Sequence, residues 1–234
     1  MRRTLGALGA VVALVAGLMT GATQASAQRP HGTMLVIGDS ITARYAASGT
    51  NRGWWSVVAE RAGMTPVVSA ESGSGFLMHG ATLPNGTRGG TCRGSDFTER
   101  LHVVSSVRPD AIVVAGGRND YKVCRDGRAR VATKAETKRA IARYMKDLSI
   151  LTKSLGIPRT IVYVTSPWGT YAADRGRYVR PWVKQYAERY GFTWIPTRSL
   201  EDRFTVDGTH PNAAGNAEVA RRVLAGSNLA KRSW

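Results

Sequence analysis

The chain is strongly basic, because its 234 residues hold 33 Lys and Arg against 16 Asp and Glu, a formal net charge of +17. At this length it can bury one well-formed core, and two ordinary domains are excluded. Arg is spread through the sequence and no recognition helix, zinc finger or RNA-binding signature accompanies it, so specific nucleic-acid binding is the weaker interpretation. The charge instead predicts electrostatic association with anionic surroundings such as a cell envelope.

The first 27 residues have the parts of a secretory signal peptide. Arg2 and Arg3 form a positive start, residues 5–19 are an apolar run with glycines, and Ala25-Ser26-Ala27 is a small-residue cleavage site. We therefore expect cleavage near Ala27 and a secreted, extracytoplasmic single domain of residues 28–234. An uncleaved anchor is the alternative, although the apolar run is somewhat shorter than the roughly 20 residues of a spanning helix. No later segment could span a membrane.

Five short segments rich in Val and Ile alternate with helical patterns along the rest of the chain. The short segments have the apolar character of strands covered on both faces, and they lie at 33–37, 65–69, 111–115, 160–164 and 192–195. The helical patterns lie at 54–63, 97–107, 134–155, 178–190 and 213–224. Such alternation predicts parallel βαβ units, and hence a three-layer α/β sandwich around a parallel sheet of about five strands.

Ligands of such sheets bind beyond the carboxyl ends of the strands. The first of these loops begins with Gly38-Asp39-Ser40, in which the glycine allows a tight turn and Ser40 begins the next segment with its hydroxyl exposed. Near the C-terminus Asp207 precedes His210 by three residues, so its carboxylate can orient an imidazole that acts as a base. A serine, a histidine and an aspartate in these roles form a catalytic triad. Taken alone, Gly38-Asp39-Ser40 is more readily a helix cap, and the segment from Asp207 to His210 is also explained as a turn.

Two further loops offer hydrogen-bond donors for a developing oxyanion. The glycine-rich segment 69–76 follows the second strand and contains Gly73 and Gly75, whose amides no side chain would block. The third strand is followed by two glycines and then Asn119, which carries a neutral amide donor near the strand end. Either segment could instead be an ordinary turn.

The two cysteines, Cys92 and Cys124, are expected to form a disulfide because an exported chain meets an oxidising environment. Two unpaired thiols are the alternative. The segment 76–95 around Cys92 is long and has no regular pattern, as lids and binding loops often do. The disulfide would therefore hold a binding loop against the Asn119 side of the site.

Trp168 and Tyr171 follow the fourth strand and are candidates for contact with an acyl chain or a sugar, although packing explains either residue equally well. The other histidines, His31, His79 and His102, have no zinc-ligand spacing, so neither a metal nor another cofactor is expected.

Four segments, in this order, resemble the four blocks of the SGNH, or GDSL-type, hydrolase family across nearly the whole mature chain. They are Gly38-Asp39-Ser40, Gly73, Gly117-Arg118-Asn119-Asp120 and Asp207-Gly208-Thr209-His210. The resemblance implies a flavodoxin-like α/β/α sandwich in which Ser40 is the nucleophile, His210 the base and Asp207 its orienting carboxylate. It further implies an oxyanion hole made of the amides of Ser40 and Gly73 and the side chain of Asn119.

One block departs from the family's pattern, because an Asn usually precedes its glycine where this chain has Ser69-Ala70-Glu71-Ser72. Gly75 therefore stays an alternative to Gly73, and Glu71 has no assigned role.

The resemblance implies a secreted serine esterase that hydrolyses carboxylic esters of lipids or O-acylated carbohydrates through an acyl-enzyme. An acyltransferase with the same triad is one alternative. A catalytically silent, basic envelope-binding protein on this fold is another, and a nucleic-acid binder is the third.

Overall fold

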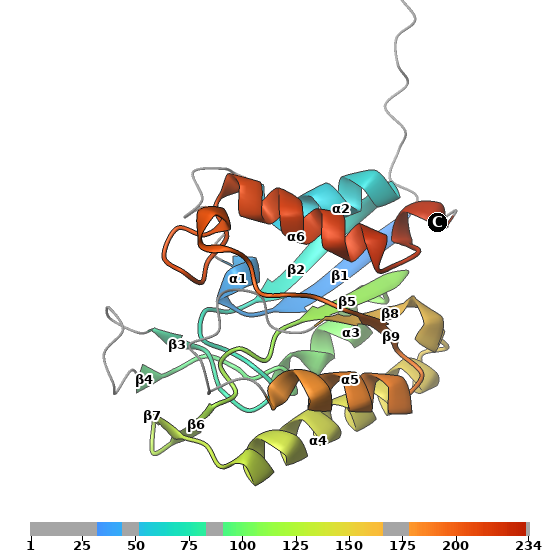
Figure 1. Ribbon diagram of the computed structural model, residues 1–234. Helices are drawn as coiled ribbons and strands as arrows, with labels where there is room; N and C mark the ends of the chain where they lie inside the picture. The colour runs from blue at the N-terminus through green and yellow to red at the C-terminus, as the bar shows by residue number, and fades with distance from the viewer. Residues whose placement is uncertain (1–31, 44–51, 83–90, 166–177, 233–234) are drawn as a thin grey trace, which may run out of the picture.

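The computed structural model describes residues 32–43, 52–82, 91–165 and 178–232 and is built around a five-stranded parallel sheet (Figure 1). The strand order is β2-β1-β5-β8-β9. The strands are β1 (Gly32–Gly38), β2 (Met64–Ala70), β5 (Ala111–Ala115), β8 (Val162–Thr165) and β9 (Thr193–Ile195). All four pairings are parallel, so the predicted α/β class and sheet are confirmed.

Helices cover both faces of this sheet (Figure 1). One face carries α2 (Trp54–Ala62) and α6 (Ala213–Ala225), and the other carries α3 (His102–Val107), α4 (Lys134–Ser154) and α5 (Val179–Arg189). A single turn, α1 (Ser40–Ala43), follows β1 directly. Short 3₁₀ turns complete the described elements: η2 (Glu99–Leu101), η3 (Arg159–Ile161), η4 (Asp202–Phe204) and η5 (Leu229–Lys231).

Strand β1 shows why the strands are apolar on both sides. Met34 and Val36 pack into the core beneath α2 and α6, while Leu35 and Ile37 pack into the core beneath α4 and α5. Alternate side chains of a strand point to opposite faces, so a strand covered on both faces is apolar at most positions.

The longest helix, α4, begins where the sequence pattern predicts, because Thr133 and Glu136 form a capping box. The Thr133 hydroxyl accepts the Glu136 N–H at 3.2 Å, and the Glu136 carboxylate accepts the Thr133 N–H at 2.8 Å. Both groups satisfy amide donors that a helix start leaves without partners.

None of the helices in the described ranges is long and apolar enough to cross a bilayer.

A second sheet, absent from the sequence expectations, lies beyond the carboxyl ends of the main strands (Figure 1). Its order is β3-β4-β7-β6, and its strands are β3 (Ala81–Thr82), β4 (Thr91–Cys92), β6 (Lys122–Arg125) and β7 (Arg128–Val131). The expectation of a patternless loop over 76–95 was therefore wrong in part, because this segment supplies two of the strands. Strands this short and polar carry no readable periodicity.

Cys92 of β4 and Cys124 of β6 form the expected disulfide. These strands flank β7, so the bond links the loop after β2 to the loop after β5 across the small sheet. The two loops are thus joined both by strand pairing and covalently.

Removing this disulfide with Cys92→Ser and Cys124→Ser should lower the free energy of unfolding by about 3 to 4 kcal/mol, because the bond closes a long loop in the unfolded chain. Urea unfolding of the wild type and of the double variant measures the difference. Adding reductant should destabilise the wild type and leave the double variant unchanged. Equal stability of the two proteins, or two reactive thiols in the native wild type, would contradict the pairing.

Candidate active site

The neighbouring strands β2, β1 and β5 end at paired positions of the sheet. The last residue of β1, Gly38, pairs with Ala70 at the end of β2 and with Ala115 at the end of β5. The loops that follow these three strands therefore leave the sheet side by side. They are the loops that hold the predicted nucleophile and the predicted oxyanion donors.

The turn from β1 into α1 positions Ser40. A Cβ atom on Gly38 would lie 2.3 Å from Thr42 Oγ1, so only glycine fits here. The turn is closed by the Asp39 carbonyl, which accepts the N–H of Thr42 at 3.1 Å and that of Ala43 at 2.9 Å. Asp39 itself is buried, whereas Ser40 is partly exposed as the first residue of the helical turn.

Ser40, His210 and Asp207 form one hydrogen-bonded chain. His210 Nε2 lies 2.9 Å from Ser40 Oγ, although 170 positions separate the two residues. His210 Nδ1 lies 2.7 Å from Asp207 Oδ2. With Nδ1–H donating to the carboxylate, Nε2 is the nitrogen that accepts from the serine hydroxyl. The structure thus brings together all three residues that the sequence singled out as a triad.

The loop around Asp207 holds this carboxylate in place. Its Oδ1 accepts the N–H groups of His210 at 2.8 Å and of Thr209 at 3.1 Å. Burial alone would raise the pKa of Asp207, but the backbone and side-chain hydrogen bonds from His210 and the Thr209 N–H outweigh it and lower that pKa below its ordinary value. Asp207 therefore stays an ionised partner for the imidazole.

The loop after β2 distinguishes between its two candidate glycines. The Gly75 N–H already donates to the Met78 carbonyl at 2.8 Å, and a Cβ there would lie 2.4 Å from the Asp120 carboxylate. Gly73 is buried with φ of +77°, and its N–H has no hydrogen-bond partner within the described ranges. The geometry therefore favours Gly73 as the donor of this loop.

Asn119 joins the loop after β5 to the loop after β2. Its Nδ2 donates to the Ser74 carbonyl at 2.9 Å, directly beside Gly73. A primary amide has two N–H donors. One fixes the side chain, and the second has no hydrogen-bond partner among the described residues.

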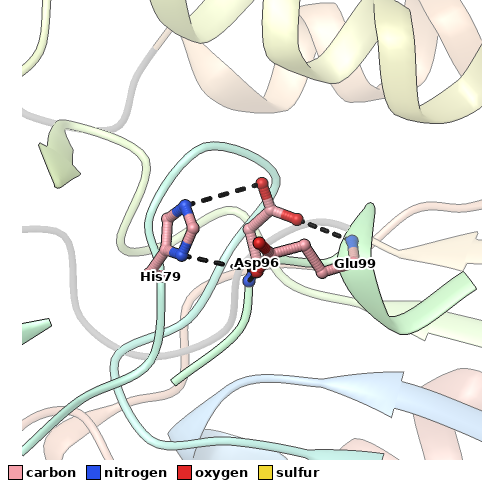
Figure 2. A group of neighbouring side chains, drawn as sticks. All are labelled: His79, Asp96 and Glu99. Atoms are coloured by element: carbon pink, nitrogen blue, oxygen red, sulfur yellow. Dashed lines mark hydrogen bonds and ion pairs between the residues drawn. The ribbon is translucent and has the colours of Figure 1, made fainter. Parts of the chain in front are cut away.

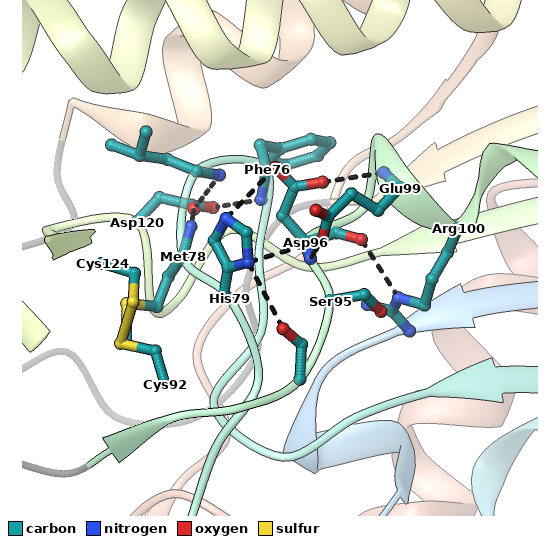
Figure 3. A network of polar contacts seen from close by, with 12 residues as sticks. Phe76, Met78, His79, Cys92, Ser95, Asp96, Glu99, Arg100, Asp120 and Cys124 are labelled. Carbon is teal, nitrogen blue, oxygen red and sulfur yellow. Dashed lines mark hydrogen bonds and ion pairs between the residues drawn. A yellow bond between two sulfur atoms is a disulfide. The ribbon is translucent and has the colours of Figure 1, made fainter. Parts of the chain in front are cut away.

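A buried carboxylate, Asp120, shapes the loop after β2 (Figure 3). It accepts the N–H groups of Phe76 at 3.1 Å, Leu77 at 2.7 Å and Met78 at 3.2 Å. Burial raises the pKa of Asp120 to about 6, and the three amide bonds limit the rise. Asp120 thus holds together the turn that follows the predicted oxyanion glycine.

The sequence assigned no role to Glu71, and the structure supplies one. Its Oε2 accepts the Ser95 N–H at 2.8 Å, and its Oε1 accepts the Ser95 hydroxyl at 2.6 Å. Glu71 therefore fastens the end of β2 to the segment that returns from β4. No sequence signal could have paired residues that lie 24 positions apart in two irregular segments.

Arg118 is a further residue at this edge that the sequence did not single out for a role. Its Nη2 donates to Thr209 Oγ1 at 2.7 Å. This bond connects the loop of Asn119 to the loop that carries Asp207 and His210.

The predicted substrate residues Trp168 and Tyr171 lie outside the described residues.

Within the described ranges, one group of side chains offers atoms close enough to share a cation: His79, Asp96 and Glu99, at the start of η2 (Figure 2). The two carboxylates are positioned by a reciprocal cap, in which Asp96 accepts the Glu99 N–H at 2.8 Å and Glu99 accepts the Asp96 N–H at 3.0 Å. His79 Nδ1 lies 3.4 Å from Glu99 Oε2. The cluster shares no residue with the chain of Ser40, His210 and Asp207.

The family model of the GDSL-like lipase/acylhydrolase family matches residues 36–218 of the chain. No curated protein matches the chain in sequence.

Solved structures resemble the fold at low sequence identity. A protein described as lipolytic and of the G-D-S-L family, from Desulfitobacterium hafniense, aligns with a TM-score of 0.58 and 14% identity over 83% of this chain and 98% of that one. TesA aligns at 0.55 and 18% identity over 83% and 97%. Axe2, an acetylxylan esterase from Geobacillus stearothermophilus, aligns at 0.51 and 18% identity over 85% and 95%.

The family match defines a class, the carboxylic ester hydrolases. The chain belongs to the GDSL-like lipase/acylhydrolase family.

The buried Asp39 generates a prediction about stability and pH. Burial raises the pKa of Asp39 to about 7 from an ordinary value of 3.8, and its Oδ2 has no hydrogen-bond partner within the described ranges. The folded protein keeps the proton of Asp39 to about pH 7, whereas the unfolded chain releases it near pH 4. Between these values the folded state binds more protons than the unfolded state, so the free energy of unfolding of the wild type falls as the pH rises. Asp39→Asn cannot ionise, so its unfolding free energy relative to wild type should increase from pH 5 to pH 8.

Urea unfolding at several pH values tests this, with Asp202→Asn as the matched control for the same substitution at an exposed position. A constant difference for Asp39→Asn would contradict the predicted ionisation.

Proposed function

We propose that the protein is a secreted serine esterase that hydrolyses carboxylic esters through Ser40, His210 and Asp207. The hydrogen-bonded chain from Asp207 Oδ2 to His210 and on to Ser40 Oγ, with links of 2.7 and 2.9 Å, is the observation that carries this proposal. His210 would accept the proton of Ser40 as its oxygen attacks the ester carbonyl, and would return that proton to the departing alcohol. Water activated by His210 would then cleave the acyl-enzyme.

Three donors would stabilise the oxyanion of this reaction. They are the N–H of Ser40, the N–H of Gly73 and the second N–H of Asn119. The two amides follow strand ends that lie in register, and the Asn119 side chain is held by the carbonyl of Ser74. Preorganised donors of this kind stabilise the transition state because they need no reorientation as the negative charge develops.

We propose an ester of a lipid or an O-acylated carbohydrate as the substrate. Membership of the lipase/acylhydrolase family supports ester substrates generally. One similar fold belongs to an acetylxylan esterase, which makes acetylated polysaccharide a reasonable first choice. Trp168 and Tyr171 keep their proposed role in contacting the acyl chain or sugar. Rates on esters of increasing chain length and on acetylated polysaccharides, with product analysis in the presence of an alcohol acceptor, would distinguish these substrates and reveal any acyl transfer.

Ser40→Ala should abolish turnover of p-nitrophenyl acetate and labelling by a fluorophosphonate, since triad nucleophiles contribute on the order of 10⁶-fold to kcat. Ser106→Ala, which removes an exposed hydroxyl on α3, is the matched control and should keep the wild-type rate. Initial rates and gel detection of the labelled protein measure both effects. If Ser40→Ala retained its rate, another nucleophile would be required, and a wild type inert to both reagents would favour the silent envelope-binding alternative.

Secretion and envelope association are parts of the same proposal. The signal-peptide pattern of residues 1–27 and the disulfide support export. Cleavage after Ala27 would remove Arg2 and Arg3 and lower the formal charge from +17 to +15 (17 − 2), which still supports attraction to anionic envelope polymers.

Expression of the full chain with its native leader should release a protein whose N-terminal residue is Gln28. N-terminal sequencing of protein recovered outside the cytoplasm measures this. An intact N-terminus that stays with the membrane fraction would support the uncleaved-anchor alternative instead.

A further inference from the structure

A buried arginine lies beneath the loops that carry the proposed oxyanion donors. Arg100, in η2, is 3% exposed. Its Nη1 donates to the carbonyls of Gly38 at 3.0 Å and of Ser69 at 2.6 Å, and its Nη2 donates to the hydroxyl of Ser74 at 2.7 Å. One planar guanidinium thus connects the end of β1, the end of β2 and the loop after β2.

The three acceptors belong to the neighbourhood of the proposed oxyanion hole. Gly38 stands two positions before Ser40, and Ser74 directly follows Gly73. The carbonyl of the same Ser74 accepts the amide of Asn119 at 2.9 Å. Arg100 is therefore connected to all three proposed donors: to Ser40 through Gly38, and to Gly73 and Asn119 through Ser74.

We propose that Arg100 is a positioning residue of the oxyanion hole, which fixes the amides of Ser40 and Gly73 and, through Ser74, the side chain of Asn119 at their working separations. This role rests on the proposed function. It goes beyond the triad because Arg100 touches neither Ser40 nor His210 in any described hydrogen bond.

The surroundings of Arg100 restrict it to this geometry. The guanidinium lies 4.9 Å from the centre of the Phe97 ring, which packs against one face of the guanidinium. Burial lowers the pKa of Arg100, and the negative charges of Glu71 and Asp96 oppose that effect. A guanidinium remains charged even so, and its fixed fork of donors can serve several acceptors at set angles.

Hydrophobic packing alone does not account for a buried charge at this position. Desolvating a charged group is costly, and well-packed apolar residues of similar volume often stabilise a protein as well or better. An apolar side chain could not supply the directional bonds to the carbonyls of Gly38, Ser69 and Asp96 and to the hydroxyl of Ser74, the bond to Asp96 being the longest at 3.4 Å.

Arg100→Met, which keeps the length of the side chain without its donors, should lower kcat for p-nitrophenyl acetate at least tenfold with KM changed less than about twofold, because misplaced oxyanion donors weaken transition-state binding. Arg100→Lys should be intermediate, since an ammonium cannot hold the three acceptors in one plane. Ser74→Ala removes one acceptor of Arg100, the Ser74 hydroxyl, and should lower kcat by a smaller factor than Arg100→Met. This variant tests the proposal if Arg100→Met does not fold.

A double-mutant cycle with Asn119→Ala separates positioning from a general loss of stability. If Arg100 acts through the oxyanion hole, Arg100→Met should lower kcat by a smaller factor in the Asn119→Ala background than in the wild type. Val223→Ala, on α6 in the core of the opposite face of the sheet, is the control that lowers stability away from Arg100 and the loop after β2, and it should leave kcat of the folded protein unchanged.

Two results would overturn the role of Arg100 while leaving the proposed function intact. The first is a wild-type kcat in both Arg100→Met and Ser74→Ala while Ser40→Ala is inactive. The second is that Arg100→Met lowers kcat by the same factor in the wild type and in the Asn119→Ala background. Absence of any Ser40-dependent turnover in the wild type would instead overturn the proposed function, and this role with it.

Discussion

The site depends on the register of three neighbouring parallel strands. Gly38 of β1 pairs with both Ala70 of β2 and Ala115 of β5, so the three strands end together. Because parallel strands run in one direction, the loops that follow them leave from the same edge of the sheet. A shift of one residue in either pairing would turn the last side chains of that strand to the other face and displace its loop from the serine.

Irregular loops at such an edge need polar anchors, because their backbone groups are not satisfied by a sheet or helix. Two buried charged residues provide these anchors, one as a hydrogen-bond acceptor and the other as a donor. Asp120 accepts three successive amides in the loop after β2, and Arg100 donates to carbonyls at the ends of β1 and β2. Each charge is stabilised by several backbone partners instead of one counter-ion. The same bonds satisfy backbone groups that are buried away from water, and they hold the loops in one conformation.

The small sheet extends this arrangement away from the strand ends. It pairs β4, from the loop after β2, with β7, from the loop after β5, and the disulfide links the flanking strands. The loops that carry Gly73 and Asn119 are therefore joined at two places. The Asn119–Ser74 hydrogen bond joins them at the proposed oxyanion hole, and the Cys92–Cys124 disulfide joins them in the small sheet.

Local patterns in the sequence were sufficient for the main sheet, its helices and the candidate serine, histidine and aspartate, because periodicity, capping and turn chemistry depend on residues a few positions apart. They could not choose between Gly73 and Gly75, or assign Glu71 and Arg100, whose partners lie 24 to 62 positions away in other segments. On a helical pattern Arg100 looks like one more solvated charge. Only the tertiary structure shows the burial and the hydrogen-bond partners from which these roles are proposed, since such contacts exist once distant segments have packed together.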